Sequence, residues 1–496
     1  MEEVRLADTT LRDGPNSLWA QLMRTGMMVP IAEQLDSVGF DSIELDCKPS
    51  KKIFRELKED PWERLRLIHS RVKNTPLRGI GGSLNSFEIT PRSVSNLYMK
   101  LMAEHGIRQM RMTEPANDVS RAANMVQLAR QNGLEPIPNV TFSISPKHTD
   151  DYYAKKTKQI ASLNVFRICL KDPGGLLTPE RMRTLVPRVL ENANGKPVEL
   201  HPHCNTGLGP INAVEGAKLG IRIIHVAIPP LANGTSLPSV YNVAKNLRAL
   251  GYKTSINEKN VAPITEHFNS VARFEHFPVG APLEYDYGYY LHQIPGGMMS
   301  NLIHQLKQVR MQDRLQEVLD EIVRVRAELG YPIMVTPFSQ FVGTQAVMNI
   351  ILGERYKEVT EQVILYTQGA WGEEAAADID PNVRDKILDR PRARELSKLP
   401  RQEPTIEEIR QKLGGPNLSD EELLIRTVMG KEGVPDIKPY DPSQDYLSAR
   451  QPVLALIQQL AKRSNRSYVH IQRNGINVTL KKSKVNQAEG TAKESK

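Results

Sequence analysis

The residues with the clearest potential for chemistry are His201 and His203, two positions apart in His201-Pro202-His203. The preceding Val198–Leu200 favours an extended strand. Alternate side chains of a strand share one face, so imidazoles at this spacing can bind one metal ion. Two histidines on a half-buried strand give the same pattern, and the spacing alone leaves both interpretations open.

Two further segments carry charged groups at or just past the ends of expected strands. They are Asp8-Thr9-Thr10-Leu11-Arg12-Asp13 near the N-terminus and Lys171-Asp172-Pro173-Gly174-Gly175. A carboxylate beside two imidazoles is a typical ligand set for a divalent ion. The simplest interpretation of Lys171 is a salt bridge with Asp172 on the rim.

The alternation of β-rich runs with helical patterns over residues 1 to 230 predicts a (β/α)8 barrel. A doubly wound open sheet is the alternative, but no G-x-G-x-x-G follows the first strand. Chemistry in such barrels lies at the carboxyl ends of the strands, so Asp13, Lys171 and both histidines should meet on one rim. The expected strands are Val4–Asp8, Asp41–Leu45, Leu77–Gly81, Ile107–Met112, Glu135–Phe142, Asn164–Leu170, Val198–His203 and Ile221–Ala227.

We place the barrel domain at residues 1–300 and a second, α-helical domain at residues 301–437. Amphipathic spacing within the barrel indicates helices such as Val94–His105 and Ala122–Gln131. The clearest amphipathic segments of the helical part are Ser300–Val309, Arg314–Gly330 and Gln340–Ile351.

The C-terminal part is expected to form a small module. A Pro-containing linker at residues 438–448 leads to residues 449–482, which combine a short helix, Pro452–Arg463, with a β-hairpin around Asn474-Gly475. Elements this small bury too little surface to be stable alone, so they either fold back onto the helical domain or dock a partner chain. The Lys-rich residues 483–496 are expected to be disordered.

Composition is that of an ordinary globular protein, with 40% hydrophobic and 25% charged residues. No apolar run approaches the length of a membrane span, and the N-terminus lacks a secretory pattern. Cys47, Cys169 and Cys204 have no C-x-x-C spacing, which favours reduced thiols and the cytoplasm. The net charge of +8 with 6% aromatic residues does not indicate a nucleic-acid face.

Taken together, six segments resemble the carboxyltransferase module of pyruvate carboxylase, the oxaloacetate decarboxylase α chain and the transcarboxylase 5S subunit. The resemblance spans roughly residues 2 to 400. The Glu-Asp-Pro-Trp and Pro-Gly-Gly segments distinguish this family from other metal-dependent lyase barrels. The six segments are Asp8–Asp13, Glu59–Leu65, Leu170–Asp172, His201–His203, Ile294–Leu302 and Val335–Pro337.

The resemblance implies a divalent ion, Zn²⁺ or Mn²⁺, held by Asp13, Lys171, His201 and His203. Lys171 would bind as its carbamate, since an ammonium cannot coordinate a cation. The ion would stabilise the enolate through which CO2 moves between biotin and a 2-oxo acid.

Two further roles follow from the resemblance. Ser300 stands where the family has Thr or Ser, and its hydroxyl could relay a proton to or from biotin; a helix N-cap is the alternative. Arg12 could pair with the substrate carboxylate or simply brace the rim.

The substrate pocket departs from the family pattern. Asn16 replaces a glutamine that contacts the oxo acid, and Leu45–Lys51 replaces a Trp-Gly-Gly stretch. Gly82 aligns with the arginine that binds pyruvate, so Lys51 becomes the candidate substitute cation, with a solvated loop lysine as the alternative. We therefore expect poor turnover with pyruvate.

Biotin is expected to come from another chain. The Met99-Lys100 pair lies in a helical pattern rather than in the hairpin of a biotin-accepting lysine, and no Gly-rich ATP-binding region is recognisable. The expected partners are a separate biotin carrier protein and a biotin carboxylase subunit, with a homodimer or larger assembly expected by resemblance alone. Two alternatives stay open: a biotin-independent metal-dependent lyase or condensing enzyme, and a non-catalytic structural subunit.

Overall fold

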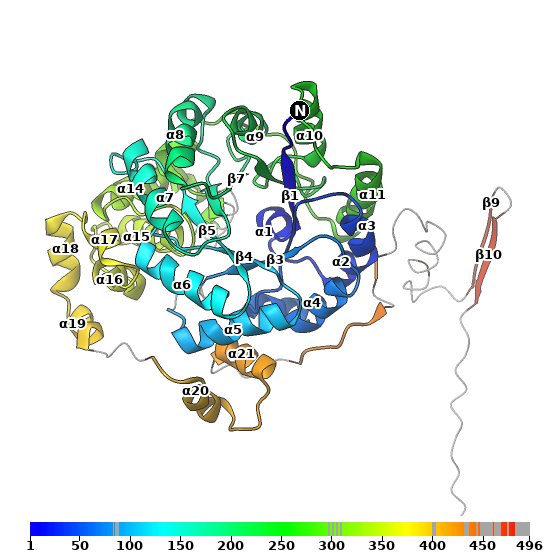
Figure 1. Cartoon of the computed structure of the whole chain (residues 1–496). Helices are drawn as coiled ribbons and strands as arrows, with labels where there is room; N and C mark the ends of the chain where they lie inside the picture. The colour runs from blue at the N-terminus through cyan, green and yellow to red at the C-terminus, as the bar shows by residue number, and fades with distance from the viewer. Residues whose placement is uncertain are drawn as a thin grey trace, which may run out of the picture.

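The computed structural model describes residues 1–82, 84, 89–295, 298–299, 302–303, 306–307, 310–398, 403–430, 436–442, 445–446, 460, 468–473 and 476–481. Its centre is a closed barrel of eight parallel strands in sequence order (Figure 1). This confirms the predicted (β/α)8 barrel. The strands are β1 (Arg5–Leu11), β2 (Ile43–Leu45), β3 (Leu77–Gly81), β4 (Gln109–Met112), β5 (Glu135–Thr141), β6 (Ile168–Asp172), β7 (Val198–Pro202) and β8 (Ile223–Val226).

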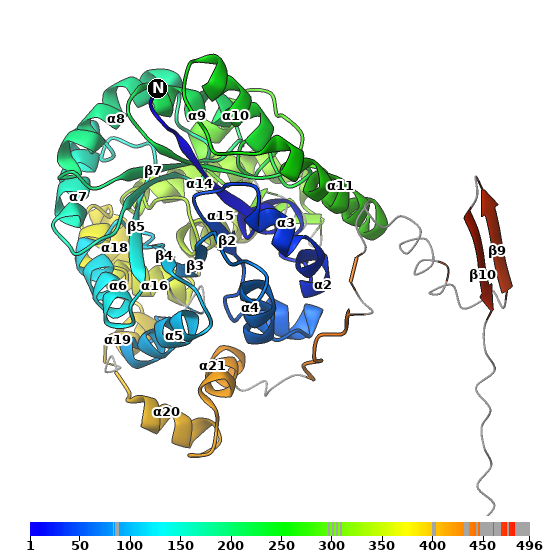
Figure 2. The same cartoon turned by 45° about the vertical axis from the view of Figure 1, so that its right-hand side comes forward.

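Helices surround the barrel on its outside, as Figure 2 shows from a second direction. Many begin at a capping residue: the Thr178 side chain accepts from the Arg181 N–H, and Pro179 takes the first helical position. The helices of this part of the chain are α1 (Asp13–Leu18), which directly follows β1, and α2 (Thr25–Met28), α3 (Ala32–Asp36), α4 (Pro61–His69), α5 (Arg92–Glu104), α6 (Val119–Gln131), α7 (Asp150–Ala161), α8 (Pro179–Asn192), α9 (Gly209–Lys218), α10 (Val240–Ala249) and α11 (Glu258–Glu275), with the single turns η1 (Val29–Ile31) and η2 (Ile53–Leu57).

The apolar core lies between strands and helices, whereas the inside of the barrel is polar. Outward-facing Leu170, Leu200 and Ile224 are fully buried in the apolar core. The residues between them along each strand, such as Glu199 and His225, face the inside of the barrel. They are equally buried but charged or polar. A barrel interior is ordinarily filled by branched apolar side chains, so this polar filling points to a functional centre.

A second apolar cluster runs from Ile294 to Ala393 and belongs to the helices that follow the barrel. Its longest helices, α14 and α15, pack on each other, in agreement with two of the amphipathic segments. The third such segment, Ser300–Val309, lies largely outside the described residues. The helices are α12 (Gly288–His292), α14 (Leu315–Glu328), α15 (Phe338–Leu352), α16 (Glu361–Thr367), α17 (Glu373–Ala376), α18 (Pro381–Leu388) and α19 (Pro391–Lys398), with the turn η3 (Gln312–Arg314).

The chain then returns to the barrel. Helix α20 (Ile406–Leu413) leads to α21 (Asp420–Met429), which packs on α5 and shares the apolar core of the barrel. Lys100 of α5 pairs with Asp420 at 3.0 Å. The expected helical domain of residues 301–437 is thus divided in space between the second cluster and the barrel surface.

The expected hairpin is present as the antiparallel pair β9 (Tyr468–Arg473) and β10 (Ile476–Lys481). Figures 1 and 2 both draw it apart from the barrel. The expected helix Pro452–Arg463 lies outside the described residues except for Leu460, and so do residues 483–496.

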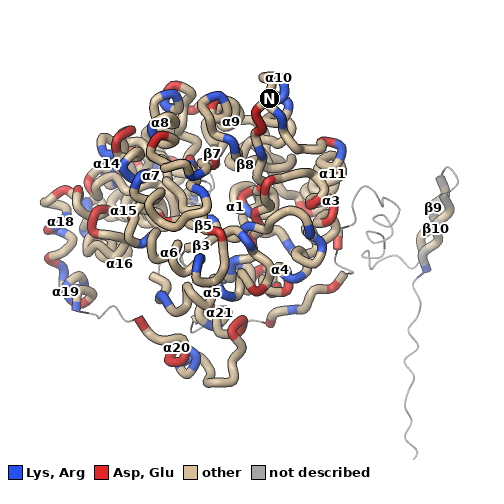
Figure 3. Tube along the Cα trace, viewed as in Figure 1, with Lys and Arg blue, Asp and Glu red and all other residues tan. Residues whose placement is uncertain are grey.

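The described surface carries charges of both signs. Segments with Lys or Arg and segments with Asp or Glu are both scattered over the outer helices (Figure 3). Within the described part of the chain, none of the helices combines the length and apolar character needed to cross a bilayer.

Candidate active site

Three strand ends bring the candidate ligands to one side of the rim. Asp13 opens α1 two residues after β1 ends, and His201 and His203 lie at the end of β7. Lys171 of β6 is the register partner of His201 on the neighbouring strand. Side chains far apart in sequence therefore meet because parallel strands present their carboxyl ends to the same rim.

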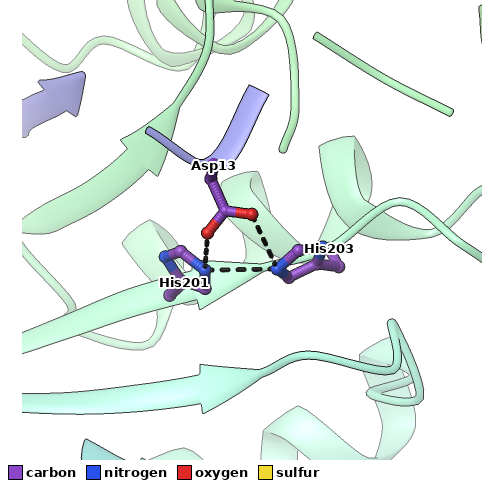
Figure 4. A group of neighbouring side chains, drawn as sticks. All are labelled: Asp13, His201 and His203. Atoms are coloured by element: carbon purple, nitrogen blue, oxygen red, sulfur yellow. Dashed lines mark hydrogen bonds and ion pairs between the residues drawn. The ribbon is translucent and has the colours of Figure 1, made fainter. Parts of the chain in front are cut away.

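Asp13, His201 and His203 point toward one another (Figure 4). Asp13 Oδ2 lies 3.1 Å from His201 Nε2, and Asp13 Oδ1 lies 3.6 Å from His203 Nε2. The two Nε2 atoms are 3.2 Å apart. Atoms that share one tetrahedral Zn²⁺ at ordinary bond lengths stand roughly 3.3–3.6 Å apart. The spacing therefore fits a common metal ion.

The protonation of these groups also fits a cation. Burial lowers the pKa of both imidazoles, which favours their neutral form. His203 Nδ1 lies 2.9 Å from the Thr235 carbonyl, which only accepts, so Nδ1 carries the proton and Nε2 the lone pair. Asp13 Oδ2 is an ionised carboxylate oxygen that pairs with Arg12 on one side and faces His201 Nε2 on the other. Facing lone pairs are stabilised by a positive ion between them.

Lys171 is a buried lysine beside these groups, with 8% of its surface exposed. Burial lowers the pKa of its ammonium. The alternative salt bridge with Asp172 is absent: within the described residues Lys171 forms no ion pair, and the Asp172 carboxylate accepts the N–H groups of Leu176 and Leu177 at 2.9 and 2.8 Å.

The Arg12 guanidinium lies against two carboxylates, Asp13 and Glu44. Burial alone would raise the pKa of Asp13, but Arg12 beside it holds that pKa well below the usual range. Glu44 also accepts from Arg111 Nε at 2.7 Å, and Arg111 Nη1 has no hydrogen-bond partner among the described residues. Arg12 therefore braces the rim in this structure; a contact with substrate stays a prediction.

The other expected site residues are dispersed. The Asn16 amide nitrogen donates to the Arg12 carbonyl at 3.3 Å and to Asp46 Oδ2 at 3.2 Å, which keeps it near the rim. Lys51 is exposed, just before η2. Ser300 lies outside the described residues.

A cavity of about 450 Å³ opens over the ends of β3 and β4. Thr336 and Trp371 of the helical part close one side of it, and Lys48, rather than Lys51, is among its lining residues. Burial lowers the pKa of the half-buried Lys48 to about 8 in spite of the nearby Asp46. Gly82, where the family arginine aligns, also lines the cavity. It has φ +141°, and a Cβ there would lie 3.2 Å from the Thr113 carbonyl, so this backbone does not suit an arginine.

The motifs did not reveal the ionic network below the rim. Glu199 accepts from Arg78 at 2.9 Å and from Arg167 at 2.9 Å, and His225 Nε2 lies 2.9 Å from its Oε2. A signal was present, because Glu199 and His201 alternate with apolar residues on β7, as Gln109 and Arg111 do on β4. Polar residues at a period of two in buried strands indicate a polar barrel interior.

Two families cover most of the chain. The family described as HMGL-like matches residues 3–267, and the conserved carboxylase domain matches residues 289–455. In structure, the carboxyl transferase domain of Rhizobium etli pyruvate carboxylase superposes with a TM-score of 0.76 at 23% identity, over 87% of this chain and 76% of that one. At this identity the likeness establishes the fold.

Relatives of higher identity specify the family. A pyruvate carboxylase subunit of Methanocaldococcus jannaschii is 38% identical over 391 residues, which is 78% of this chain and 68% of the relative. The 2-oxoglutarate carboxylase large subunit of Hydrogenobacter thermophilus is 30% identical, over 78% of this chain and 60% of the relative. The methylmalonyl-CoA carboxyltransferase 5S subunit of Propionibacterium freudenreichii subsp. shermanii is 30% identical, over 77% and 76%. The resemblance noted from the motifs is thereby confirmed, and the chain belongs to the biotin-dependent carboxyltransferase family.

Proposed function

We propose that the chain moves CO2 between carboxybiotin on a separate carrier chain and a 2-oxo acid. The observation that carries the proposal is the buried group of Asp13, His201 and His203, whose ligand atoms face one another at the rim. In the carboxylation direction the bond between biotin nitrogen and CO2 breaks and the carbon next to the oxo group loses a proton. A C–C bond to CO2 forms, and the proton ends on the biotin nitrogen.

The residues present fit a divalent ion, and we assign Zn²⁺ or Mn²⁺ to Asp13, His201, His203 and a carbamate of Lys171. Such an ion, when bound, supplies a Lewis acid for the negative charge that develops on the oxo oxygen. Lys171 suits the carbamate role because it is buried, unpaired among the described residues and next to His201 in register. Arg12 orients Asp13, and the Thr235 carbonyl fixes the proton of His203 on Nδ1.

The proton transfer is assigned to Ser300 through the family resemblance. The substrate carboxylate is assigned to Lys48, which lines the cavity and takes the role expected of Lys51 from the sequence. An ammonium is a compact point charge that holds a carboxylate less rigidly than an arginine fork. This supports the expectation that pyruvate is a poor substrate.

The proposed function is tested by transfer of labelled CO2 from N1-carboxybiotin to a panel of 2-oxo acids. We expect carboxylation of at least one acid, with pyruvate slower by roughly 10-fold or more because the bidentate partner is missing. Pyruvate turnover equal to that of the preferred acid would refute the pocket assignment. Cleavage or condensation of a substrate without biotin would favour the lyase alternative, to which the HMGL-like match lends support. No turnover of either kind would favour the structural subunit.

The role of Lys48 predicts a pH dependence. Because its pKa is about 8, the ammonium loses its proton as the pH rises past 8, and the KM for the acid should rise there. Lys48→Met should raise KM at pH 7 by about 10- to 100-fold, the value of a charge-assisted hydrogen bond, and should remove the pH step. Lys48→Arg should also remove the step, because guanidinium stays charged. The measurement is KM between pH 6.5 and 9.5.

The matched control is Lys51→Met, an exposed lysine three positions on. Its KM should equal that of the wild type at every pH. An increase of KM in Lys51→Met with no change in Lys48→Met would instead support the assignment made from the sequence.

The biotin carrier and the biotin carboxylase are placed on separate chains. In support, Met99 and Lys100 lie within α5, and Lys100 pairs with Asp420, so this pair is not a biotin-accepting hairpin. The hairpin β9–β10 is the candidate docking element for the carrier, in keeping with its position apart from the barrel in both views. Assembly as a dimer or larger and location in the cytoplasm stay predictions.

A further inference from the structure

Behind His201, on the side away from Asp13, lies a chain of polar side chains with no surface exposure. His201 Nδ1 lies 2.7 Å from His225 Nδ1, and His225 Nε2 lies 2.9 Å from Glu199 Oε2. All three side chains are 0% exposed, and they come from the neighbouring strands β7 and β8. A buried chain of this kind must distribute its protons in one order, because each contact needs one donor and one acceptor.

The order follows from the Glu199 end. Both oxygens of Glu199 accept from guanidinium groups, Oε2 from Arg78 at 2.9 Å and Oε1 from Arg167 at 2.9 Å. Two guanidinium groups, one on each oxygen, keep Glu199 as a carboxylate, which only accepts. His225 Nε2 must then donate to it. The 3.1 Å contact between Arg78 Nη1 and His225 Nε2 is that of two donors converging on one oxygen.

The rest of the chain is then determined. The Arg78 guanidinium, 3.1 Å from Nε2, disfavours a second positive charge on the His225 ring, so the ring is neutral and its Nδ1 has the lone pair. His201 Nδ1–H therefore donates to His225 Nδ1, which leaves the lone pair of His201 on Nε2. That atom faces Asp13 and His203. For His203 the Thr235 carbonyl has this role: it accepts the proton of Nδ1, which leaves the lone pair on Nε2.

Glu199 and His225 also lie near Cys169, and these three side chains could be taken for a second metal site. The two guanidinium groups on Glu199 argue against this, because its oxygens are already satisfied and a cation there would meet two positive charges. The group is better explained as the support of His201.

We propose that His225, held by Glu199, is a positioning residue that fixes the tautomer and orientation of His201 and thereby sets the metal affinity of the rim. The inference rests on the metal site of the proposed function. Partners of this kind behind a ligating histidine typically change metal affinity by about 10- to 100-fold. Here the support is a second histidine, whose Nδ1 contacts His201 and whose Nε2 contacts Glu199. Substitutions that keep only one of these two contacts separate their effects.

The test measures the Zn²⁺ dissociation constant of the full-length protein by competition with a chelator, together with the thermal midpoint of the metal-free protein. His225→Leu removes the acceptor for His201 and should weaken Zn²⁺ binding by about 10- to 100-fold. His225→Asn places its amide oxygen near the position of Nδ1 and should restore binding to within a few-fold. If His225→Leu does not fold, His225→Gln serves instead, because its longer amide reaches Glu199 but leaves no acceptor for His201.

The matched control is His267→Leu. His267 is also 0% exposed, and its Nε2 contacts the Met27 carbonyl at 2.7 Å, away from the rim. This variant should lower the thermal midpoint and leave the dissociation constant unchanged. The proposal is overturned if His225→Leu binds Zn²⁺ as the wild type does, or if Leu and Asn at position 225 weaken it equally. A wild-type protein that binds no Zn²⁺ and no Mn²⁺ would overturn the metal site itself, and with it this role.

Discussion

His203→Ala should lose both the metal and carboxyl transfer. The wild-type protein, purified without chelators, should contain about one Zn²⁺ or Mn²⁺ per chain, because the ligand atoms of Asp13, His201 and His203 face one another at the rim. Removal of one imidazole leaves an incomplete ligand set, and the lost Lewis acid should slow transfer by roughly 10³-fold or more. Elemental analysis and transfer of labelled CO2 measure the two effects.

His69→Ala is the control, because His69 is an exposed histidine in the last turn of α4. It should keep full metal content and activity. Wild-type protein without stoichiometric metal would contradict the assignment, and so would mass spectrometry under native conditions that finds Lys171 unmodified in metal-loaded protein.

Glu44→Gln should destabilise the barrel more than any surface substitution. Glu44 is 1% exposed and neutralises two guanidinium groups, those of Arg12 and Arg111. Glutamine keeps the shape of the side chain but removes its charge, which leaves Asp13 as the ion-pair partner that Arg12 and Arg111 share among the described residues. Loss of one partner from a buried ionic group costs roughly 3–5 kcal/mol. The loss of stability is measured as the shift of the thermal or urea midpoint. A midpoint is used in place of a free energy of unfolding because a chain of this size need not unfold in one step.

Glu317→Gln provides the comparison at the surface. Glu317 pairs with Arg314 at 2.7 Å, both side chains are exposed, and such pairs contribute little to stability. Its midpoint should stay near that of the wild type. Equal shifts for the two variants would show that the interior network contributes no more than a surface ion pair.

The sequence by itself determined the architecture and the approach of the candidate ligands. Eight β-rich runs alternating with amphipathic helices allow few arrangements, and parallel strands with helical crossovers must present their carboxyl ends together. Asp13, Lys171, His201 and His203 follow or end three such runs, so their approach could be predicted without coordinates. The hairpin around Asn474-Gly475 was equally predictable, because its signal is local.

Which lysine borders the cavity was decided by the path of a loop. Lys48 and Lys51 stand three positions apart after β2, and nothing in composition or spacing distinguishes them. In the structure Lys48 lines the cavity, whereas Lys51 is exposed just before η2. The other side of the cavity is formed by Thr336 and Trp371, which are distant in sequence, so no local pattern reveals which lysine borders it.

The support of the metal site was likewise decided by tertiary structure alone. His225 follows His201 by 24 residues and belongs to a different strand, so no motif joins them. The parallel pairing of β7 with β8 brings the two strands together, and its register places His201 and His225 side by side, with Nδ1 against Nδ1. Periodicity determines which residues face the interior, but strand pairing and register determine which of them touch. A buried donor must meet an acceptor, and that requirement can be checked only once both positions are known.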